Sequence, residues 1–371
     1  MTARRRLAPA ERIAWLRLAR TESIGPATFA ALRARFPDIH EACDAAPRLA
    51  RRGGARELQI SGEAGAKAEL ERLEKLHGRI IASIEPEFPP GLAALDPPPP
   101  LISVLGNVAL LQREIIAMVG ARNASGLGIK LAGMIAGDLG RAGLVVVSGL
   151  ARGIDHAAHR AALETGTIAV VAGGVDVVYP PEHQEIYGEI SRRGAILSEM
   201  PAGMAPLPRH FPRRNRLISG LARGVVVIEA AERSGSLITA HYAVEQGRDV
   251  FAVPGSPLDP RARGANRLIR DGAVLTESAD DVLNSISPLL KQGFREPVQR
   301  ELAAAPVGHE VEAEADRVRS AVQEKLGAAP LDVDELIRQT GAPPEAVTTV
   351  LLELELAGAV QRHPGNRVSW R

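Results

Sequence analysis

The sequence predicts a doubly wound α/β domain flanked by a small helical domain and a winged helix. In the middle of the chain, short apolar runs alternate with helical segments, whereas the beginning reads as short helices and the end as three helices followed by a hairpin. We therefore expect a helical domain at residues 1–80, the α/β domain at 81–287, a linker at 288–315 and the winged helix at 316–371.

Six apolar runs rich in β-branched residues predict the strands of the central domain. Because these runs are apolar throughout and are separated by helical segments, they indicate a parallel sheet that helices cover on both faces. Ligands of such sheets bind at the carboxyl ends of the strands, so the loops that follow the runs are the expected site. The runs are IIAMVG (115–120), LVVVSG (144–149), TIAVVAGG (167–174), AILSEM (195–200), VVVIEA (225–230) and DVFAVPG (249–255).

The beginning of the chain is expected to fold into short helices. The stretch SIGPATFAALRARF has a turn at Gly25-Pro26 followed by apolar residues at helical spacing, and it resembles a helix-hairpin-helix or SAM-like turn. Such hairpins can hold a DNA phosphate with backbone N–H groups at a helix start, but a plain helical domain fits the same pattern. The proline-rich stretch at 83–100 predicts a linker or an ordered strap.

The end of the chain predicts three helices and a short hairpin, which is the order of a winged helix. The third helix contains Glu345, Glu353 and Glu355 but neither lysine nor arginine. Because a recognition helix in a DNA groove needs hydrogen-bond donors and positive charge, we expect this domain to contact protein, or the DNA backbone weakly, rather than to read bases. The helices are expected at 316–326, 332–340 and 343–357.

Composition narrows the class of protein. The chain has 371 residues and a formal net charge of +1, so any nucleic-acid site must come from local clustering of charge. The single cysteine, Cys43, excludes an internal disulfide framework and a multi-cysteine zinc site, and it fits a reducing compartment. Neither the apolar stretch of a secretory signal nor a run of about 20 apolar residues occurs, so we expect a soluble, cytoplasmic protein without membrane contact.

Glycine-rich loops follow four of the expected strands. The first, VGARNASGLG at 119–128, is not G-x-G-x-x-G, and no P-loop motif occurs, so neither a dinucleotide-binding protein nor a P-loop NTPase is expected. What remains are turns into helix starts, whose free N–H groups and hydroxyls can hold several phosphates or one phosphorylated small molecule. The candidate residues in these loops are Arg122, Ser125, Gly149, Arg152, Gly153, Gly173, Gly174, Ser234, Gly235, Ser236 and Thr239.

A basic run, RHFPRRNR at 209–216, lies between two of the expected strands. Its arginines are expected to open a helix after Pro212, and arginine at a helix start implies an anionic partner because the helix macrodipole opposes it. The aromatic side chain of Phe211 could stack on a base or could fill the core under the loop. The candidates are Phe211, Arg213, Arg214, Asn215 and Arg216, with Asn266 and Arg267 in a second basic cluster at 259–273.

Patterns for catalysis and metal binding are weak. His156 and His159 lie three residues apart on one expected helix, but no cysteine supports them and Asp155 is expected to cap that helix. Glu199 and Glu229 end strands, and we expect them to pair with neighbouring arginines rather than to act as acid or base. No hydrolase motif occurs, so we predict a protein that is not an enzyme and that uses no metal or cofactor.

The run HFPRRNRLISGLARGVVVIEAAERSGSLITAHYAVEQGRDVFAVPG resembles the central signature of the DNA-processing protein A (DprA/Smf) family. VGARNASGLG, SGLARGIDHAAH, GGVDVVYPPEH and GANRLIRDGA resemble its other motifs in the same order, over about 115–275. The resemblance implies an extended Rossmann-like fold that binds single-stranded DNA without sequence preference. It also implies that the protein protects incoming strands during natural transformation, loads the RecA recombinase on them and forms a homodimer through its Rossmann-like domain.

The resemblance also assigns roles to residues. It implies that Arg122 contacts a phosphate. Two further family motifs correspond to Phe211, Arg213, Arg214, Asn215 and Arg216 and to Ser234, Gly235, Ser236 and Thr239. Because the chain has few lysines, arginine must supply nearly all of the charge, which suits bidentate contact with phosphate. The apolar residues that form either a dimer seam or ordinary core are Leu268, Ile269, Val274 and Leu275.

Two other functions stay open at this point. The glycine loops also resemble those of nucleotide phosphoribohydrolases of the lysine-decarboxylase-like group, which would make the chain an enzyme. Those proteins carry a P-G-G-x-G-T-x-x-E stretch, whereas the corresponding region here reads SGSLITAHYAVE and lacks that spacing and its glutamate. The basic loops could also hold a phosphorylated ligand and serve as a regulatory sensor.

Overall fold

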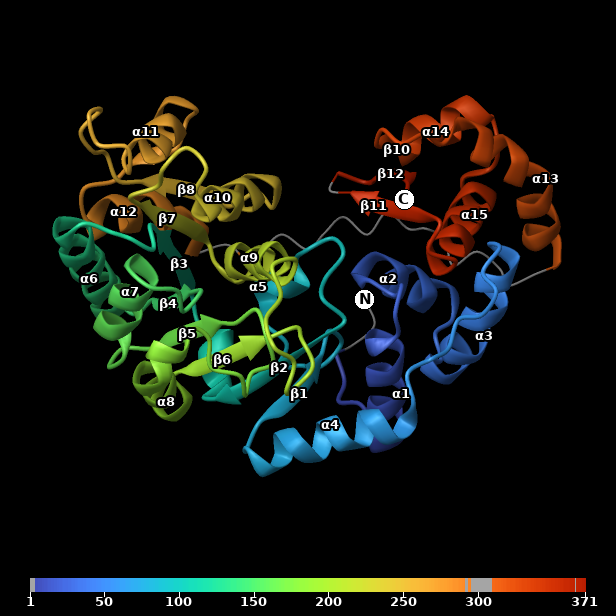
Figure 1. The fold of residues 1–371 in the computed structure, drawn as a ribbon, viewed down its shortest axis with the longest axis horizontal. Coiled ribbons are helices and arrows are strands. Elements are labelled where there is room, and N and C mark those ends of the chain that lie inside the picture. Colours follow the sequence, from blue (N-terminus) through green and yellow to red (C-terminus); the bar gives the residue numbers. More distant parts are fainter. Residues whose placement is uncertain (1–3, 291–292, 295–308, 364) are drawn as a thin grey trace. The chain divides into compact units, whose positions relative to one another are not determined.

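The chain divides into two compact units, each of which is discontinuous in sequence (Figure 1). The structure is a computed structural model, and it describes residues 4–290, 293–294, 309–363 and 365–371. The first unit comprises Met1–Arg6 and Glu69–Pro297, and the second comprises Leu7–Ala68 and Val298–Arg371. Apart from residues 4–6, which belong to the first unit, both ends of the described chain contribute to the second unit, and the middle of the chain forms the first.

A nine-stranded sheet forms the centre of the first unit (Figure 1). Its strands are β1 (Arg79–Ala82), β2 (Leu101–Gly106), β3 (Ile115–Gly120), β4 (Val145–Ser148), β5 (Thr167–Val170), β6 (Ala195–Ser198), β7 (Gly224–Ile228), β8 (Asp249–Ala252) and β9 (Val274–Leu275). The order is β1-β2-β6-β5-β4-β3-β7-β8-β9. In this order, all strands from β6 through β3 to β9 run parallel to one another. Strand β2 pairs antiparallel with β6, and β1 pairs antiparallel with β2. The order reverses between β3 and β7, which makes this the switch point of the sheet.

Helices cover both faces of this sheet. The helices are α5 (Pro90–Ala93), α6 (Gly126–Arg141), α7 (Ile154–Ala162), α8 (Gln184–Arg193), α9 (His210–Leu221), α10 (Gly235–Glu245), α11 (Arg263–Arg270) and α12 (Ala279–Leu290), with short 3-10 turns at Val108–Gln112 and Pro181–His183. Helices α6, α7 and α12 pack against Met118 and Val226 on one face. Helices α5, α9 and α10 pack against Ala117 and Val227 on the other. Neighbouring residues of one strand thus enter opposite layers, as the alternation of side chains in a strand requires.

The second unit combines the first helices of the chain with a winged helix. Its helices are α1 (Pro9–Arg20), α2 (Pro26–Arg35), α3 (Ile39–Arg52), α13 (His309–Lys325), α14 (Val333–Thr340) and α15 (Pro344–Leu356), and the division between the units falls within α4 (Glu63–Lys75). The wing is a three-stranded antiparallel sheet in the order β10-β12-β11, made of β10 (Leu331–Asp332), β11 (Val360–His363) and β12 (Arg367–Trp370). Leu336, Leu351 and Val368 are fully buried between the helices and the wing.

The predicted fold class is confirmed: a mostly parallel α/β domain, a helical beginning and a winged helix. All six predicted runs form strands. The proline-rich stretch is an ordered strap, because it joins β1 to β2 and places Phe88 in the core. The prediction missed several elements, among them β1, β2, β9 and α3. Strand β2 pairs antiparallel with β6, and β1 pairs antiparallel with β2, so β1 joins the sheet only through β2.

The described ends of the expected linker are helical. Helix α12 continues to Leu290 and α13 begins at His309, while the rest of the predicted linker lies outside the described residues. The boundaries between the predicted domains therefore stay a prediction. Among the described helices, none has the length and apolar character needed to cross a membrane.

Two glycines of the first unit give opposite expectations for the same substitution. A Cβ atom at Gly120 would overlap the carbonyl oxygen of Ile228 and the side chain of Ile154, whereas Gly133 in α6 has open space around it. Gly120→Ala should lower the free energy of unfolding by about 1–3 kcal/mol, as overpacked cores do. Gly133→Ala should raise it by about 0.5–1 kcal/mol, because alanine favours helix. Urea unfolding of both variants measures this, and a stable Gly120→Ala protein would contradict the close approach of β3, β7 and α7.

Candidate nucleic-acid interface

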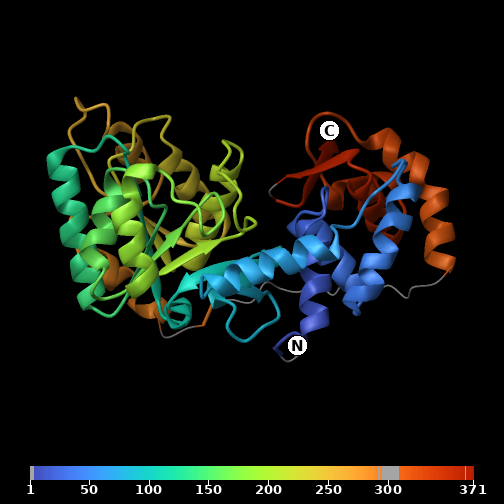
Figure 2. The same cartoon turned by 60° about the horizontal axis from the view of Figure 1, so that its bottom comes forward.

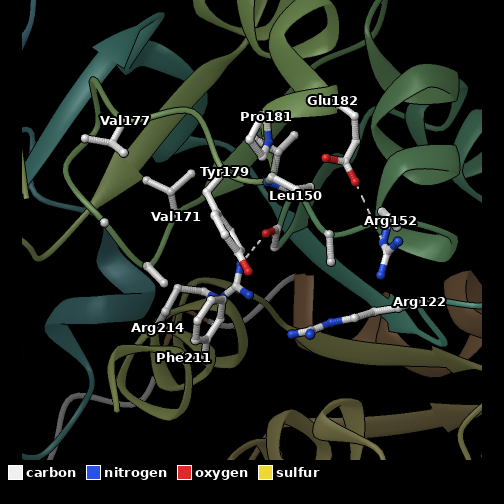
Figure 3. Close-up of a pocket in the computed structure, with 15 residues that line it drawn as sticks. Arg122, Leu150, Arg152, Val171, Val177, Tyr179, Pro181, Glu182, Phe211 and Arg214 are labelled. Atoms are coloured by element: carbon white, nitrogen blue, oxygen red, sulfur yellow. Dashed lines mark hydrogen bonds and ion pairs between the residues drawn. The ribbon is translucent and has the colours of Figure 1, made fainter. Parts of the chain in front are cut away.

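A pocket of about 290 Å³ lies at the carboxyl ends of β3, β4 and β5 (Figure 3). The loops after these three strands and the first turns of α9 form its walls. Its position agrees with the rule that ligands of open α/β sheets bind outside the carboxyl ends of the strands. The lining residues are Arg122, Gly149, Leu150, Ala151, Arg152, Val171, Ala172, Gly173, Val177, Tyr179, Pro180, Pro181, Glu182, Phe211 and Arg214.

Two aromatic rings and an exposed arginine meet in this pocket. The rings of Phe211 and Tyr179 lie 5.8 Å apart, centroid to centroid, at an interplanar angle of 59°. The guanidinium carbon of Arg122 lies 5.7 Å from the Phe211 ring, and Figure 3 shows the arginine side chain reaching towards that ring. Phe211 is half-buried and lines the pocket, and Tyr179 is 49% exposed. Of the two alternatives for Phe211, the structure therefore favours a ring that is available to a ligand over a ring that fills the core.

Arg122 is the most available cation of the pocket. Its side chain is exposed, and within the described parts of the chain no carboxylate forms an ion pair with it. Arg152 is also exposed, but its Nε lies 3.9 Å from a carboxylate oxygen of Glu182. Both guanidiniums can meet a phosphate from solvent, and Arg122 can do so without first breaking an ion pair.

Arg214 has a different role from the one expected, because it is buried beneath the pocket. Its Nη1 donates to the carbonyl oxygens of Gly149 and Val170, at 2.7 Å in the second case. Burial lowers the pKa of Arg214 to about 10, while the nearby Asp155 carboxylate acts in the opposite direction. The arginine thus ties the ends of β4 and β5 together and supplies positive charge to the pocket floor.

The glycines of the loops allow these segments to pack closely against each other. A Cβ atom at Gly149 would overlap the guanidinium of Arg214, and one at Gly173 would meet the backbone of Met204. Gly153 has a φ of +74°, and a Cβ atom there would meet the backbone oxygens of Ala121 and Arg122. Glycine at position 149 leaves room for the Arg214 side chain, whereas Gly153 and Gly173 allow backbone segments to approach each other closely.

The expectation that these loops present free N–H groups to an anion is wrong for two of them. The N–H and hydroxyl of Ser125 donate to the carboxylate of Glu229, at 2.8 Å for the N–H, and the Ser125 hydroxyl caps α6 through Gly128. In the next loop, the N–H groups of Gly149 and Ala151 donate to Asp155. Carboxylates of the chain occupy the donors that a phosphate would use, and Glu229 does so at the switch point between β3 and β7.

Helix α9 begins two residues earlier than predicted, which weakens the argument from the macrodipole. It starts at His210, so Pro212 lies within the first turn and the arginines follow that turn. Arg213 and Arg216 both approach the buried carboxylate of Glu199, with N to O distances of 3.6 and 3.4 Å. Arg216 also donates to the carbonyl oxygen of Pro97 at 3.0 Å. The expected pairing of Glu199 with neighbouring arginines is therefore present.

The remaining predicted residues lie outside the lining of the pocket. Asn215 is buried and donates to the carbonyl oxygen of Gly235 at 3.3 Å, which places the loop before α10 next to α9. Ser234 caps α10 by accepting from the N–H of Ser236, and Thr239 is fully buried in the same helix. On α11, Asn266 binds both backbone groups of Gly255, and Arg267 is exposed with its Nε 3.6 Å from Asp271.

Sequence reasoning missed Tyr179, which belongs to the loop after β5. The residue stands in the stretch GGVDVVYPPEH, where only the glycines were selected. Since aromatic residues make up 3% of the chain, a tyrosine in a strand-end loop was a usable signal. The two histidines weighed for a metal belong to α7 and lie outside this pocket: His156 stacks near His183, and His159 is buried against Thr167.

The fold and the pocket define a Rossmann-like α/β protein whose site uses arginines and aromatic rings in place of a nucleotide-binding glycine motif. The chain belongs to the DprA family. The family model described as DNA recombination-mediator protein A matches residues 79–287. Two further models, a DprA-like N-terminal HHH domain and a DprA winged helix domain, match residues 9–71 and 304–366.

Individual relatives agree with this assignment. The chain is 36% identical to protein Smf of Escherichia coli over 315 residues, which cover 81% of this chain and 79% of that protein. It is 32% identical to protein Smf of Synechocystis, covering 98% of this chain and 100% of the relative. The X-ray structure of DNA processing protein A from Streptococcus pneumoniae superimposes with a TM-score of 0.64 at 36% identity, covering 75% of this chain and 98% of that one.

Arg214 is buried and Arg122 is exposed, so replacing each by alanine should change the stability of the protein by different amounts. Arg214→Ala leaves Asp155 buried without its nearby cation, so the free energy of unfolding should fall by about 3–5 kcal/mol. Arg122→Ala removes an exposed side chain, so the change should stay within about 0.5 kcal/mol. Thermal and urea unfolding of the two variants under the same conditions measure this difference. Equal stability of the two would contradict the assignment of Arg214 as the residue that holds the loops together.

Proposed function

We propose that this protein binds single-stranded DNA without sequence preference at the pocket of Figure 3. The observation that supports this most is the combination of two partly exposed aromatic rings, Phe211 and Tyr179, with the unpaired guanidinium of Arg122. Base-aromatic stacking and arginine-phosphate contacts are the two interactions that single-strand binders combine, and neither depends on the identity of the base.

The size of the pocket supports an unpaired strand rather than a duplex. Its volume of about 290 Å³ lies near the lower end of the roughly 300–1,000 Å³ found for small-molecule sites, which suits one base. A base in a duplex cannot enter such a pocket without leaving its stack. Among the relatives, DNA processing protein A from Helicobacter pylori has a solved structure whose title names a single-stranded DNA binding mode. It superimposes with a TM-score of 0.52 at 28% identity, covering 58% of this chain and 97% of that one.

We further propose that the bound strand is DNA taken up during natural transformation, which the protein protects and passes to the RecA recombinase in the cytoplasm. Membership of a family described as recombination mediators supports this role. A binding role rather than catalysis fits the pocket, because the acidic side chain in its lining, Glu182, is exposed and lies beside Arg152. The site is proposed to work without a metal or cofactor.

Homodimerisation through the α/β domain is part of this proposal, and the edge of the large sheet supports it. Strand β9 pairs with β8 on one side and ends the sheet on the other. Its two side chains, Val274 and Leu275, are 36% and 49% exposed. A strand edge with exposed apolar side chains can pair with a second copy of itself.

Oligonucleotide binding tests the proposed site. Titration of labelled oligo-dT at two salt concentrations should show binding that weakens steeply as salt rises, and absence of binding at low salt would refute the proposal. Arg122→Ala should weaken binding and reduce the magnitude of the slope of log K against log salt by about 0.7, the contribution of one phosphate contact to a single strand. Phe211→Ala should cost roughly 1–3 kcal/mol of binding free energy with the slope unchanged.

The matched control for these variants is Arg192→Ala. Arg192 is exposed near the end of α8, just before β6 begins. It therefore lies at the amino ends of the parallel strands, whereas the pocket lies at their carboxyl ends. The substitution removes the same charge as Arg122→Ala and should leave affinity and slope nearly unchanged. Equal losses in both variants would mean that total charge, and not this pocket, determines binding.

Substitution of the sheet edge tests the proposed dimer. Leu275→Glu places a charge on β9, and sedimentation should then show a shift from dimer to monomer. Met134→Glu is the control, because Met134 is 54% exposed on α6, away from that edge. A dimer that survives Leu275→Glu, or a wild-type chain that sediments as a monomer, would contradict this part of the proposal.

A further inference from the structure

Helix α15, the third helix of the winged helix, is covered along its length. Ten of its residues are buried, and they include polar and charged side chains as well as apolar ones. The helix packs against α13 of its own domain and also against α2 and α3 from the beginning of the chain. Figures 1 and 2 show α15 beside these first helices from two directions. In winged helices and other helix-turn-helix proteins that bind DNA, the corresponding helix enters the major groove.

Buried ion pairs join α15 to the first helices. The side chain of Glu353 is completely buried and accepts from Arg52 Nε at 2.7 Å and from Arg319 of α13. Arg52 also pairs with Asp316 at 3.0 Å. One arginine from α3 thus contacts carboxylates of two helices of the winged helix, and removing it would take away one of the cations that stabilise the buried carboxylate of Glu353.

A second carboxylate of α15 lies at the start of α2. Glu355 is buried and accepts from the hydroxyl of Thr28 at 3.1 Å, and it also binds Arg362 of the wing. Thr28 is the third residue of α2, so this contact is made in the first turn of the helix that follows the Gly25-Pro26 hairpin. The sequence suggested that this helix start could hold a DNA phosphate. In the structure a carboxylate of the winged helix accepts from the Thr28 hydroxyl in this first turn.

The backbone of α3 touches the backbone of α15. A Cβ atom at Gly53, which ends α3, would overlap the carbonyl group of Glu353. The φ of Gly53 is −75°, a conformation that any residue adopts, so glycine is required here by the contact with α15 and not by its own backbone. The approach is as close as those found inside a single domain.

We propose that the winged helix of this protein is a protein-docking domain: it binds the N-terminal helices of the chain through α15, the face with which a DNA-binding winged helix would bind a duplex. The contact covers α15 and reaches the first turn of α2. The composition of α15 agrees with this role, because it offers buried carboxylates and no lysine or arginine to a partner.

Hydrogen exchange of the full-length chain tests this inference. Without DNA, the amides of α15 should exchange slowly. A short DNA duplex should not slow their exchange further, even at low salt. Protection of residues 344–356 by the duplex would overturn the proposal, because it would show that α15 contacts DNA.

Gly53→Leu is the variant designed to separate α3 from α15. It should speed exchange in α15 and α3 by at least tenfold and leave α1 unchanged, since the three atoms nearest to a Cβ atom at this position all belong to α15. Gly65→Leu is the control, because Gly65 is exposed on α4 with open space around it and should leave α15 unchanged. Unchanged exchange of α15 in Gly53→Leu would overturn the proposal.

If Gly53→Leu also speeds exchange in α1, the helical domain of that variant is misfolded. A second variant then tests whether α15 docks on the first helices. Arg52→Glu brings a negative charge to the buried carboxylate of Glu353 while keeping Gly53. Faster exchange of α15 in this variant supports the docking role, and unchanged exchange overturns it.

Discussion

The close approach of the strand-end loops is the constraint on which the binding pocket depends. Gly153 and Gly173 allow backbone segments to approach each other where a Cβ atom would overlap a neighbour, and a Cβ atom at Gly149 would overlap the guanidinium of Arg214. Arg214 then fills the space that Gly149 leaves and fixes two of the loops through their carbonyl oxygens. Because the floor of the pocket is made in this way, the position of Phe211, three residues before Arg214 on the same helix, follows from the packing beneath it.

Carboxylates near the pocket are used in contacts within the chain, which is how a near-neutral protein can present a basic site. Glu199 approaches two arginines of α9, and Glu229 and Asp155 accept from the backbone donors of two loops. These contacts leave Arg122 without a carboxylate partner in the described structure. At the site that we propose, electrostatic attraction would therefore come from a few groups at the carboxyl ends of the strands and not from the total charge of the molecule.

The sequence allowed the sheet to be predicted well, because buried parallel strands are continuous apolar runs that local inspection finds. It allowed α1 and α2 to be predicted because apolar residues recur in them at helical spacing. What it could not show are contacts between distant residues. The edge strand β2 joins the sheet by pairing with the distant β6, and β1 joins it only through β2. The occupation of the first loop by Glu229 joins residues 104 positions apart, so the pattern Ser125-Gly126 looked like a free anion site.

The same limit applies to the winged helix, where the composition of α15 can be read from the sequence but the segment that packs against it cannot. The prediction that α15 does not read DNA came from local features, because the helix contains glutamates where a reader needs arginine or asparagine. Its partner could not be inferred, because Thr28 and Glu355 are 327 positions apart and meet only in the folded chain. A buried carboxylate is stable only beside donors and cations. The winged helix itself supplies Arg319 and Arg362 to these glutamates. The first helices of the chain add Arg52 and Thr28, and this shared environment is the basis on which we propose a protein interface for α15 and a DNA contact for the α/β domain.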